Sequence, residues 1–266
     1  MKKHIRIFLG CFYVLMTATV SAQGPIGGFM PGRGVTVIAP AYSIEHFSEY
    51  LFGAEKMATP LTTKSYSLYV EHGFSDTFAL LVNVPYLKID EVNRGLQDGG
   101  IFIKYRNQYQ QYLTGNFSAI TAIGLSFPLS AYPTNTDNPI GAGAVSFQGR
   151  FLMQYNFKSG AFLHAQSGLE FRLLQAIQVS MPVLFRFGYG TKWYFAEGWA
   201  EWYNTFGNGI DSNTSGGAGS DWLRVGATLY FPVVKDFGVF IGGAKVLTGR
   251  NIGLSNRLNL GVVYRL

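Results

Sequence analysis

This 266-residue chain has almost no cysteine and no long apolar run that could form a membrane helix. Its single cysteine, Cys11, lies in an N-terminal segment that we expect to be removed, which excludes disulfide scaffolds and thiol chemistry from the remainder. Beyond that segment, no stretch of 18 apolar residues is free of charge. Charged residues make up only 14% of the chain, whereas hydrophobic residues make up 48% and aromatic residues 16%. Because apolar side chains are so numerous, we expect them to alternate with polar side chains along strands, as they do in β-barrels.

The first 22 residues have the pattern of a secretory signal peptide. Residues 1–6 are basic, residues 7–20 are apolar, and residues 20–22 (Val-Ser-Ala) provide small side chains at a cleavage point before Gln23. The apolar stretch is too short for a stable membrane anchor. We therefore expect export, cleavage after residue 22, and one domain that spans residues 23–266.

The net charge is small without this segment. The whole chain carries +6 at pH 7, and three of its 21 basic residues lie within residues 1–22, which leaves 18 basic against 15 acidic residues. A net charge of +3, the difference between these counts, is too weak to indicate nucleic-acid binding.

The last ten residues, 257–266, show the clearest strand pattern. One face carries Leu258, Leu260, Val262, Tyr264 and Leu266, and the other carries Arg257, Asn259, Gly261, Val263 and Arg265. Apolar residues on one face and arginines on the other are typical of a strand with lipid outside and water inside. The segment also resembles the C-terminal insertion signal of bacterial outer-membrane proteins, so we expect the barrel-assembly machinery to recognise it. Those proteins usually end in Phe, whereas this chain has Leu266.

Similar alternation predicts about twelve strands, with ten or fourteen as alternatives. We expect them near residues 34–44, 64–73, 77–88, 99–109, 116–128, 143–157, 161–172, 178–192, 199–208, 220–232, 238–248 and 255–266. Short connections at 73–76, 110–115, 158–160, 196–198 and 235–238 alternate with mostly longer ones at 45–63, 89–98, 129–142, 173–177, 209–219 and 249–254. This is the arrangement of short periplasmic turns and long extracellular loops in outer-membrane barrels. The predicted fold is an all-β, antiparallel transmembrane β-barrel with both termini in the periplasm.

Three stretches resemble a known family. Residues 62–76 followed by 80–86, residues 95–106 (Gly-Leu-Gln-Asp-Gly-Gly-Ile-Phe-Ile-Lys-Tyr-Arg), and residues 249–253 with the terminal strand are similar to outer-membrane β-barrels named for the MetA pathway of phenol degradation. Gln97 stands where that family usually has Gly. The resemblance implies an outer-membrane channel for aromatic or other small apolar compounds.

The inward faces of the predicted strands are the place to search for function, because an Arg or Lys that faces lipid at the midplane costs about 2–4 kcal/mol. We expect the following residues to line the lumen: Lys104, Arg106, Arg150, His164, Glu170, Arg172, Arg186, Arg224, Arg257 and Arg265. Lys192 and Lys245 also fall on this face, against only Glu71, Glu170 and Glu201. A positive surplus along an open path favours anions. The alternative is a lumen filled by salt-bridged side chains that conducts nothing.

The sequence gives little support for an enzymatic site or a metal site. The only His residues beyond the signal peptide are His46, His72 and His164, and no Gly-x-Ser-x-Gly nucleophile motif occurs. A triad of His164, Glu170 and Ser146 within the lumen is the one hydrolase arrangement that the alternation allows. No His/Cys cluster has metal-ligand spacing. We therefore predict no catalytic, cofactor or metal site.

The sequence thus predicts a porin-like, non-enzymatic channel of a Gram-negative outer membrane. Its expected partners are membrane lipid and a small solute, either aromatic or apolar or a small anion, which passes through a polar, cationic lumen. A non-conducting barrel with a structural or loop-mediated binding role is the main alternative, and an outer-membrane hydrolase is the third.

Overall fold

The structure is a computed structural model of the chain, and it describes residues 26–53, 55–91, 93–134, 139–174, 177–206 and 219–266. The predicted signal peptide lies outside these residues. Twelve long strands are described: β1 (Thr36–Phe52), β2 (Glu55–Gly73), β3 (Phe78–Lys88), β5 (Asp98–Gln111), β6 (Gly115–Pro128), β7 (Val145–Phe157), β8 (Ala161–Leu173), β9 (Ile177–Gly190), β10 (Phe195–Thr205), β11 (Asp221–Val234), β12 (Phe237–Arg250) and β14 (Asn256–Arg265). Two short strands, β4 (Arg94–Leu96) and β13 (Ile252–Gly253), extend the sheet at its long-loop end.

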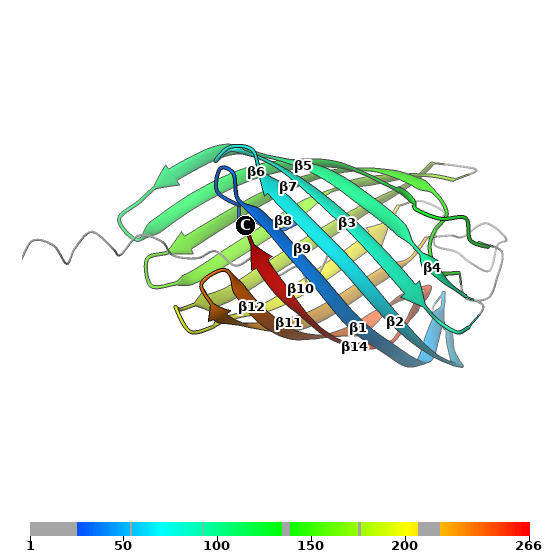
Figure 1. The fold of residues 1–266 in the computed structure, drawn as a ribbon. Coiled ribbons are helices and arrows are strands. Elements are labelled where there is room, and N and C mark those ends of the chain that lie inside the picture. Colours follow the sequence, from blue (N-terminus) through cyan, green and yellow to red (C-terminus); the bar gives the residue numbers. More distant parts are fainter. Residues whose placement is uncertain (1–25, 54, 92, 135–138, 175–176, 207–218) are drawn as a thin grey trace, which may run out of the picture.

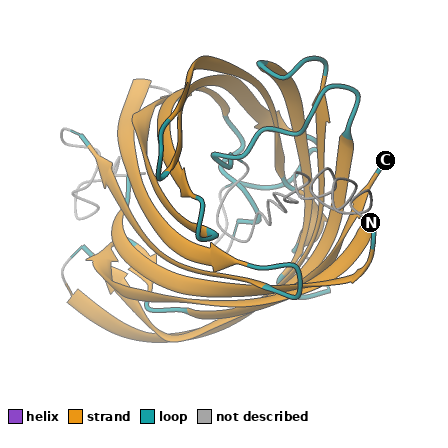
Figure 2. Ribbon diagram, turned by 90° about the vertical axis from the view of Figure 1, so that its left-hand side faces the viewer, coloured by secondary structure: helices purple, strands orange, loops and turns teal. Residues whose placement is uncertain are grey.

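These strands close into one antiparallel barrel. Each long strand pairs with its neighbours in the sequence, and β1 pairs with β14 as well as with β2, which joins the first strand to the last. Figure 1 shows β1 beside β14, and Figure 2 shows the strands forming a ring. The predicted fold class and strand number are confirmed. Among the described residues, no helix is long and apolar enough to cross a bilayer.

The two faces of the barrel wall differ as the alternation predicts. In β8, Leu163 and Leu169 on the outer face are exposed, whereas His164 and Glu170 on the inner face are buried. In β11, Leu229 and Phe231 are exposed, whereas Thr228 and Tyr230 are buried. The outer surface is therefore an apolar belt, and the interior holds most of the polar and charged side chains of the strands.

Two predicted connections are wrong. Residues 45–63 are not a loop, because β1 and β2 pair from Thr36↔His72 to Phe52↔Glu55, with the turn at Gly53, whose φ is +59°. Residues 196–198 are not a turn, because β10 begins at Phe195 and the turn is formed by residues 191–194, with Thr191 N–H donating to Tyr194 O at 2.8 Å. Lys192 therefore lies exposed in a turn and not on the inner face of a strand.

Both described ends of the chain lie where the short connections are. Thr36 and Leu266 exchange backbone hydrogen bonds of 2.9 Å, and Arg265 N–H donates to Asp236 O in a short turn. At the same end, residues 26–35 precede β1 and enter the interior, where we call them the strap. The barrel thus has a short-turn end that carries the strap and the C-terminus, and a long-loop end opposite to it.

Candidate functional site

The interior is built in two levels. At the short-turn level, the strap packs into the barrel against a buried apolar cluster that includes Leu81, Phe102, Ile120 and Leu152. At the long-loop level, a cavity of about 250 Å³ remains between β5, β7, β8, β10 and β11. These two levels are the candidate site, because any solute that crosses the barrel has to pass both.

The strap is held by close packing. Ile26 and Phe29 are buried, and the Phe29 ring makes edge-to-face contacts with Phe162 and Phe195 at centroid distances of 5.3 and 6.2 Å. Gly28 has no room for a side chain, since a Cβ there would lie 2.1 Å from Oε1 of Gln154. Glycine at this position therefore allows the strap to lie against the wall.

A fully buried ion pair fastens the strap to the barrel wall. Nζ of Lys104 lies 2.7 Å from Oε1 of Glu71, and both side chains have 0% exposure. The same Nζ donates a 2.7 Å hydrogen bond to the backbone oxygen of Phe29. Tyr69 donates a 2.5 Å hydrogen bond to Glu71 Oε2, so that both carboxylate oxygens have a donor. Lys104 thus links the strap, β2 and β5 in one contact.

Beneath the strap, several buried polar groups have no partner. Both ring nitrogens of His164, Oε1 of Gln154, and Nε and Nη2 of Arg186 make no hydrogen bond with any described residue. Buried polar groups without partners cost free energy, typically about 1–3 kcal/mol each. The docked strap therefore covers a polar stretch of wall without satisfying it.

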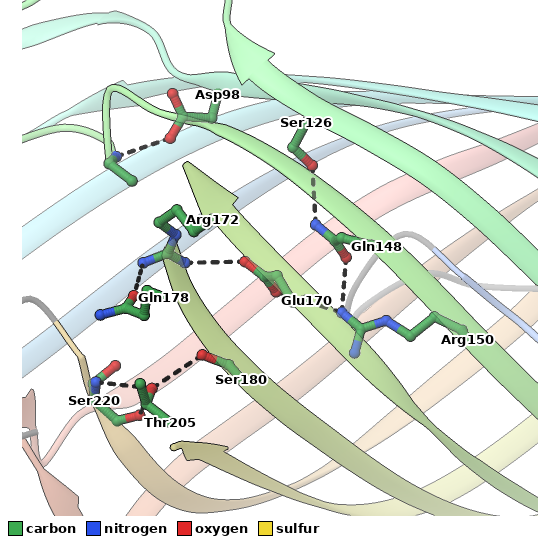
Figure 3. Close-up of polar contacts among 11 residues, drawn as sticks. Asp98, Ser126, Gln148, Arg150, Glu170, Arg172, Gln178, Ser180, Thr205 and Ser220 are labelled. Atoms are coloured by element: carbon green, nitrogen blue, oxygen red, sulfur yellow. Dashed lines mark hydrogen bonds and ion pairs between the residues drawn. The ribbon is translucent and has the colours of Figure 1, made fainter. Parts of the chain in front are cut away.

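One wall of the cavity is a chain of hydrogen bonds across β6, β7, β8 and β9 (Figure 3). Gln148 donates to Ser126 at 3.1 Å and accepts from Nη2 of Arg150 at 2.7 Å. Glu170 lies 3.6 Å from Arg150 and 3.1 Å from Arg172, which bridges to Gln178 at 3.2 Å. These contacts fix the orientation of every charged group on this wall.

The adjoining wall, formed by β10 and β11 next to β9, combines aromatic rings with a second ion pair. Tyr203 of β10 and Trp222 of β11 stack with centroids 4.0 Å apart and an interplanar angle of 2°. Arg224 pairs with Glu201 at 2.5 Å and lies over the rings of Trp199 and Trp222 at 5.8 and 6.0 Å. This wall therefore holds a stacked aromatic pair next to a paired carboxylate.

At the mouth, a long loop is anchored to the cavity. Asp98 accepts a hydrogen bond from the Tyr132 hydroxyl and another, of 2.8 Å, from Ala142 N–H. Desolvation, together with the hydrogen bond to Asp98, raises the pKa of Tyr132 to about 12. The tyrosine therefore remains a hydrogen-bond donor even at a pH where an ordinary tyrosine would be ionised.

The structure places the predicted site residues at both levels. Lys104, Arg150, His164, Glu170 and Arg186 are buried in the interior, and Arg172, Arg224 and Arg257 are partly buried and ion-paired. Arg106 and Arg265 are half-buried. The wall of the cavity brings together Arg150, Glu170 and Arg172, whereas Lys104, His164 and Arg186 belong to the strap level. Contact of these side chains with a passing solute stays a prediction.

Sequence reasoning missed inner carboxylates, among them Glu45 and Glu197, and it assigned Lys245 as well as Lys192 to the wrong face. Glu45 accepts from Arg257 at 2.8 Å across the β1–β14 pairing, but its position falls in the segment that was predicted to be a loop. Glu197 is buried near the short-turn end, in what was predicted to be a turn. Lys245 is exposed on the same face as Ile241 and Leu247, so it does not face the interior. The tyrosine–tryptophan stack also had no sequence signal, because it depends on the register between β10 and β11.

The arrangement around His164 is not that of a catalytic base. A catalytic histidine is oriented by an acid and reaches its nucleophile through a hydrogen bond. The His164 ring nitrogens have no such partner, and the carboxylate of Glu170 is occupied by Arg150 and Arg172. Within the part of the chain that the structure describes, no group of three or more His, Cys, Asp or Glu residues could hold a metal ion.

Comparison with known proteins finds similar structures. The sequence matches no protein-family model and no curated protein, so the likeness to the phenol-degradation family stays a prediction. A COG4313 outer membrane channel from Pseudomonas putida F1 has a similar structure, with a TM-score of 0.73 at 13% identity over 92% of this chain and 100% of that one. The NanC porin has a TM-score of 0.59 at 8% identity, over 86% and 100% of the two chains. The KdgM porin has a TM-score of 0.51 at 13% identity, over 84% and 98%. The fold is thus shared with outer-membrane channels and porins.

Proposed function

We propose that this protein is an outer-membrane channel through which small solutes pass by diffusion. The observation that carries the proposal is a closed barrel with an apolar outer belt around an interior that is charged, hydrogen-bonded and hollow at its long-loop level. An apolar belt suits lipid, and a polar interior suits a water-soluble cargo. The similar folds of three outer-membrane channels and porins support the same reading. The short-turn end then faces the periplasm.

In this proposal, the strap closes the channel in the state that the structure describes. The apolar cluster and the strap fill the short-turn level, so passage requires the strap to leave its place. The unpartnered polar groups of His164, Gln154 and Arg186 favour such a movement, because water would satisfy them once the strap has moved. The same packing also favours the second candidate function, a non-conducting barrel that binds its ligand from the long-loop side.

Single-channel recording distinguishes the two functions. The refolded chain, residues 23–266, is placed in a planar bilayer under a salt gradient, and stepwise currents are expected. Arg106 and Arg186 form no ion pair with a carboxylate of any described residue, whereas five other predicted lumen cations are ion-paired. These two cations predict a weak preference for anions. Silence from a protein shown to be folded, which persists after removal of residues 23–31, would contradict the channel and leave the binding barrel.

A further inference from the structure

Three basic residues form a row on the outer face of the barrel near its long-loop end. Lys64 of β2 lies directly opposite Lys88 of β3, and Lys88 lies directly opposite Arg94 of β4. Figure 1 shows these three strands side by side. Lys64 shares the face of Tyr66, two positions away, whose side chain is exposed on the outside of the barrel. We call Lys64, Lys88 and Arg94 the basic row.

The protein does not neutralise the basic row. Like charges directly opposite each other on neighbouring strands are destabilising. Glu91, in the connection between β3 and β4, pairs with Lys88 and Arg94, but its side chain is 76% exposed, and such pairs contribute little. Asp90 accepts two hydrogen bonds within the same connection. Lys64 forms no ion pair with any described residue. The row therefore offers positive charge to an external anion.

The basic row lies at the level expected for lipid head groups. The rings of Tyr42, Tyr66 and Tyr86 form a row directly beneath it, with centroids 5.1 and 6.3 Å apart. Aromatic rows of this kind mark the edge of the hydrocarbon region. The exposed Phe74 lies at the opposite, short-turn end of the same wall. From residue 64 to residue 74 the strand covers about 33 Å, or about 25 Å across the bilayer at a tilt of about 40°, which is the height of the apolar band in such barrels.

An apolar groove begins beneath the basic row. Its volume is about 430 Å³, and it lies on the outer face of β1, β2, β3 and β14. Tyr66 borders the groove, and it is lined further down by Pro40, Leu68, Val84 and Val262. Pro40 lies opposite Leu68, and Leu68 lies opposite Val84, so these side chains share one level nearer the middle of the membrane. The groove therefore leads from the head-group level into the hydrocarbon region and suits a flexible acyl chain.

We propose that the basic row and the groove together bind one phosphate-bearing lipid of the outer leaflet. Its phosphate would lie on Lys64 and Lys88, and one acyl chain would fill the groove. A lysine ammonium group is a common partner of phosphate, and basic clusters at a membrane surface bind anionic head groups. A soluble anion would use only the row, and a neutral lipid only the groove. The site goes beyond the proposed function, and only its assignment to the outer leaflet rests on it.

The test is native mass spectrometry of the refolded barrel, residues 23–266, in an uncharged detergent. Three probes are compared at equal concentration: lipid A with its phosphates, the same lipid without phosphates, and inorganic phosphate. We expect one molecule of lipid A per barrel, bound at least about tenfold more tightly than the phosphate-free lipid. Inorganic phosphate should not displace it at equal concentration, because inorganic phosphate makes no contact with the groove.

Lysine variants locate the phosphate. Lys64→Ala combined with Lys88→Ala should weaken the binding of lipid A by roughly tenfold or more and leave the phosphate-free lipid unaffected. Lys64→Arg combined with Lys88→Arg keeps both charges and should restore most of the binding. Lys245→Ala is the matched control, because Lys245 is an exposed outer cation near the same end, and its partners across the ladders are Val225 and Asn256.

Valine variants locate the acyl chain. Val84→Trp places a large side chain in the groove and should weaken both forms of the lipid at least about threefold, because less apolar surface is then buried. Val82→Trp is the matched control, since Val82 lies on the same face of β3 and does not line the groove. Heat-modified mobility on gels shows that each variant is folded.

The outcomes separate the lipid site from the channel. The proposed site would be overturned by equal binding of the two lipids, by displacement with inorganic phosphate at equal concentration, or by equal effects of a variant pair and its control. A lipid bound as expected to a barrel that gives no single-channel current would retain the site and refute the channel. Currents from a barrel that binds no lipid A would do the reverse.

Discussion

At the scale of single residues, the most demanding feature is the ion pair between Lys104 and Glu71. Both side chains are completely buried, and the pair is held by Tyr69 and by the backbone of Phe29. A buried pair contributes little net stability, because desolvation offsets the attraction between the charges. Removal of one partner is costly, since the other charge then remains buried alone.

We expect Lys104→Met to lower the free energy of unfolding by about 3–5 kcal/mol for this reason. Replacing Glu71 with Leu in the same chain should restore most of that loss. Lys56→Met is the matched control, because Lys56 forms an exposed pair with Glu49 and should cost less than about 1 kcal/mol. Urea unfolding followed by tryptophan fluorescence measures all three changes. Equal losses for the two single variants would mean that water reaches the inner pair.

At the scale of elements, ten strands lie within a few residues of their predicted positions, and the exceptions have a physical cause. The rule of apolar outside and polar inside holds only where lipid covers the outer face. In β2, residues 55–60 are exposed on both faces, so the outer part of the β1–β2 hairpin has no alternation from which it could be predicted. The turn at residues 191–194 was missed because Trp193 and Tyr194 are large aromatic residues, which are typical of strands.

The strap and the cavity could be predicted less well than the strands. Residues 26–35 are rich in Gly, contain Pro31 and have no periodicity, so the sequence does not indicate that they enter the barrel. The pairing of Arg150 with Glu170 depends on the register between β7 and β8, which no pattern within one strand specifies. Alternation predicts the face on which a charge lies, and register decides which partner it meets.

For the strap, we expect Gly28→Ala to increase single-channel conductance or the fraction of time spent open. The added Cβ would lie 2.1 Å from Gln154 Oε1 and 2.4 Å from His164 Nδ1, so the strap would have to shift. Gly32→Ala is the matched control within the strap, because a Cβ there meets its nearest atom, on Val35, at an ordinary 3.6 Å. Unchanged currents in both variants would show that this part of the strap does not limit conduction.

At the scale of the whole molecule, the apolar belt determines where the barrel can reside. Exposed Leu, Ile, Phe and Val side chains cover the outer face of nearly every long strand. Soluble monomers rarely expose a contiguous apolar patch larger than a few hundred Å². A belt around the entire barrel is therefore stable only when lipid or detergent covers it.

The location of this belt in lipid can be tested at one residue whose side chain points outward. Ile123 is 66% exposed and lies in the middle part of β6. In lipid vesicles, Ile123→Lys should lower the free energy of unfolding by about 2–4 kcal/mol, because the charge would face the bilayer interior. Leu113→Lys is the control, since Leu113 is 92% exposed in a turn between β5 and β6 and should cost little. Similar values for the two variants would place residue 123 outside the hydrocarbon region.

The joining of the first strand to the last has a consequence for the order of assembly. Glu45 and Arg257 meet across this seam although 212 positions separate them. Bringing such distant segments together costs roughly 2–3 kcal/mol more chain entropy than closing a loop of about twelve residues. Hairpins between neighbouring strands can therefore form early, whereas the seam has to form last. Until it does, the sheet has two open edges on which any other strand could pair, so the period of greatest risk for aggregation falls immediately before the ring is complete.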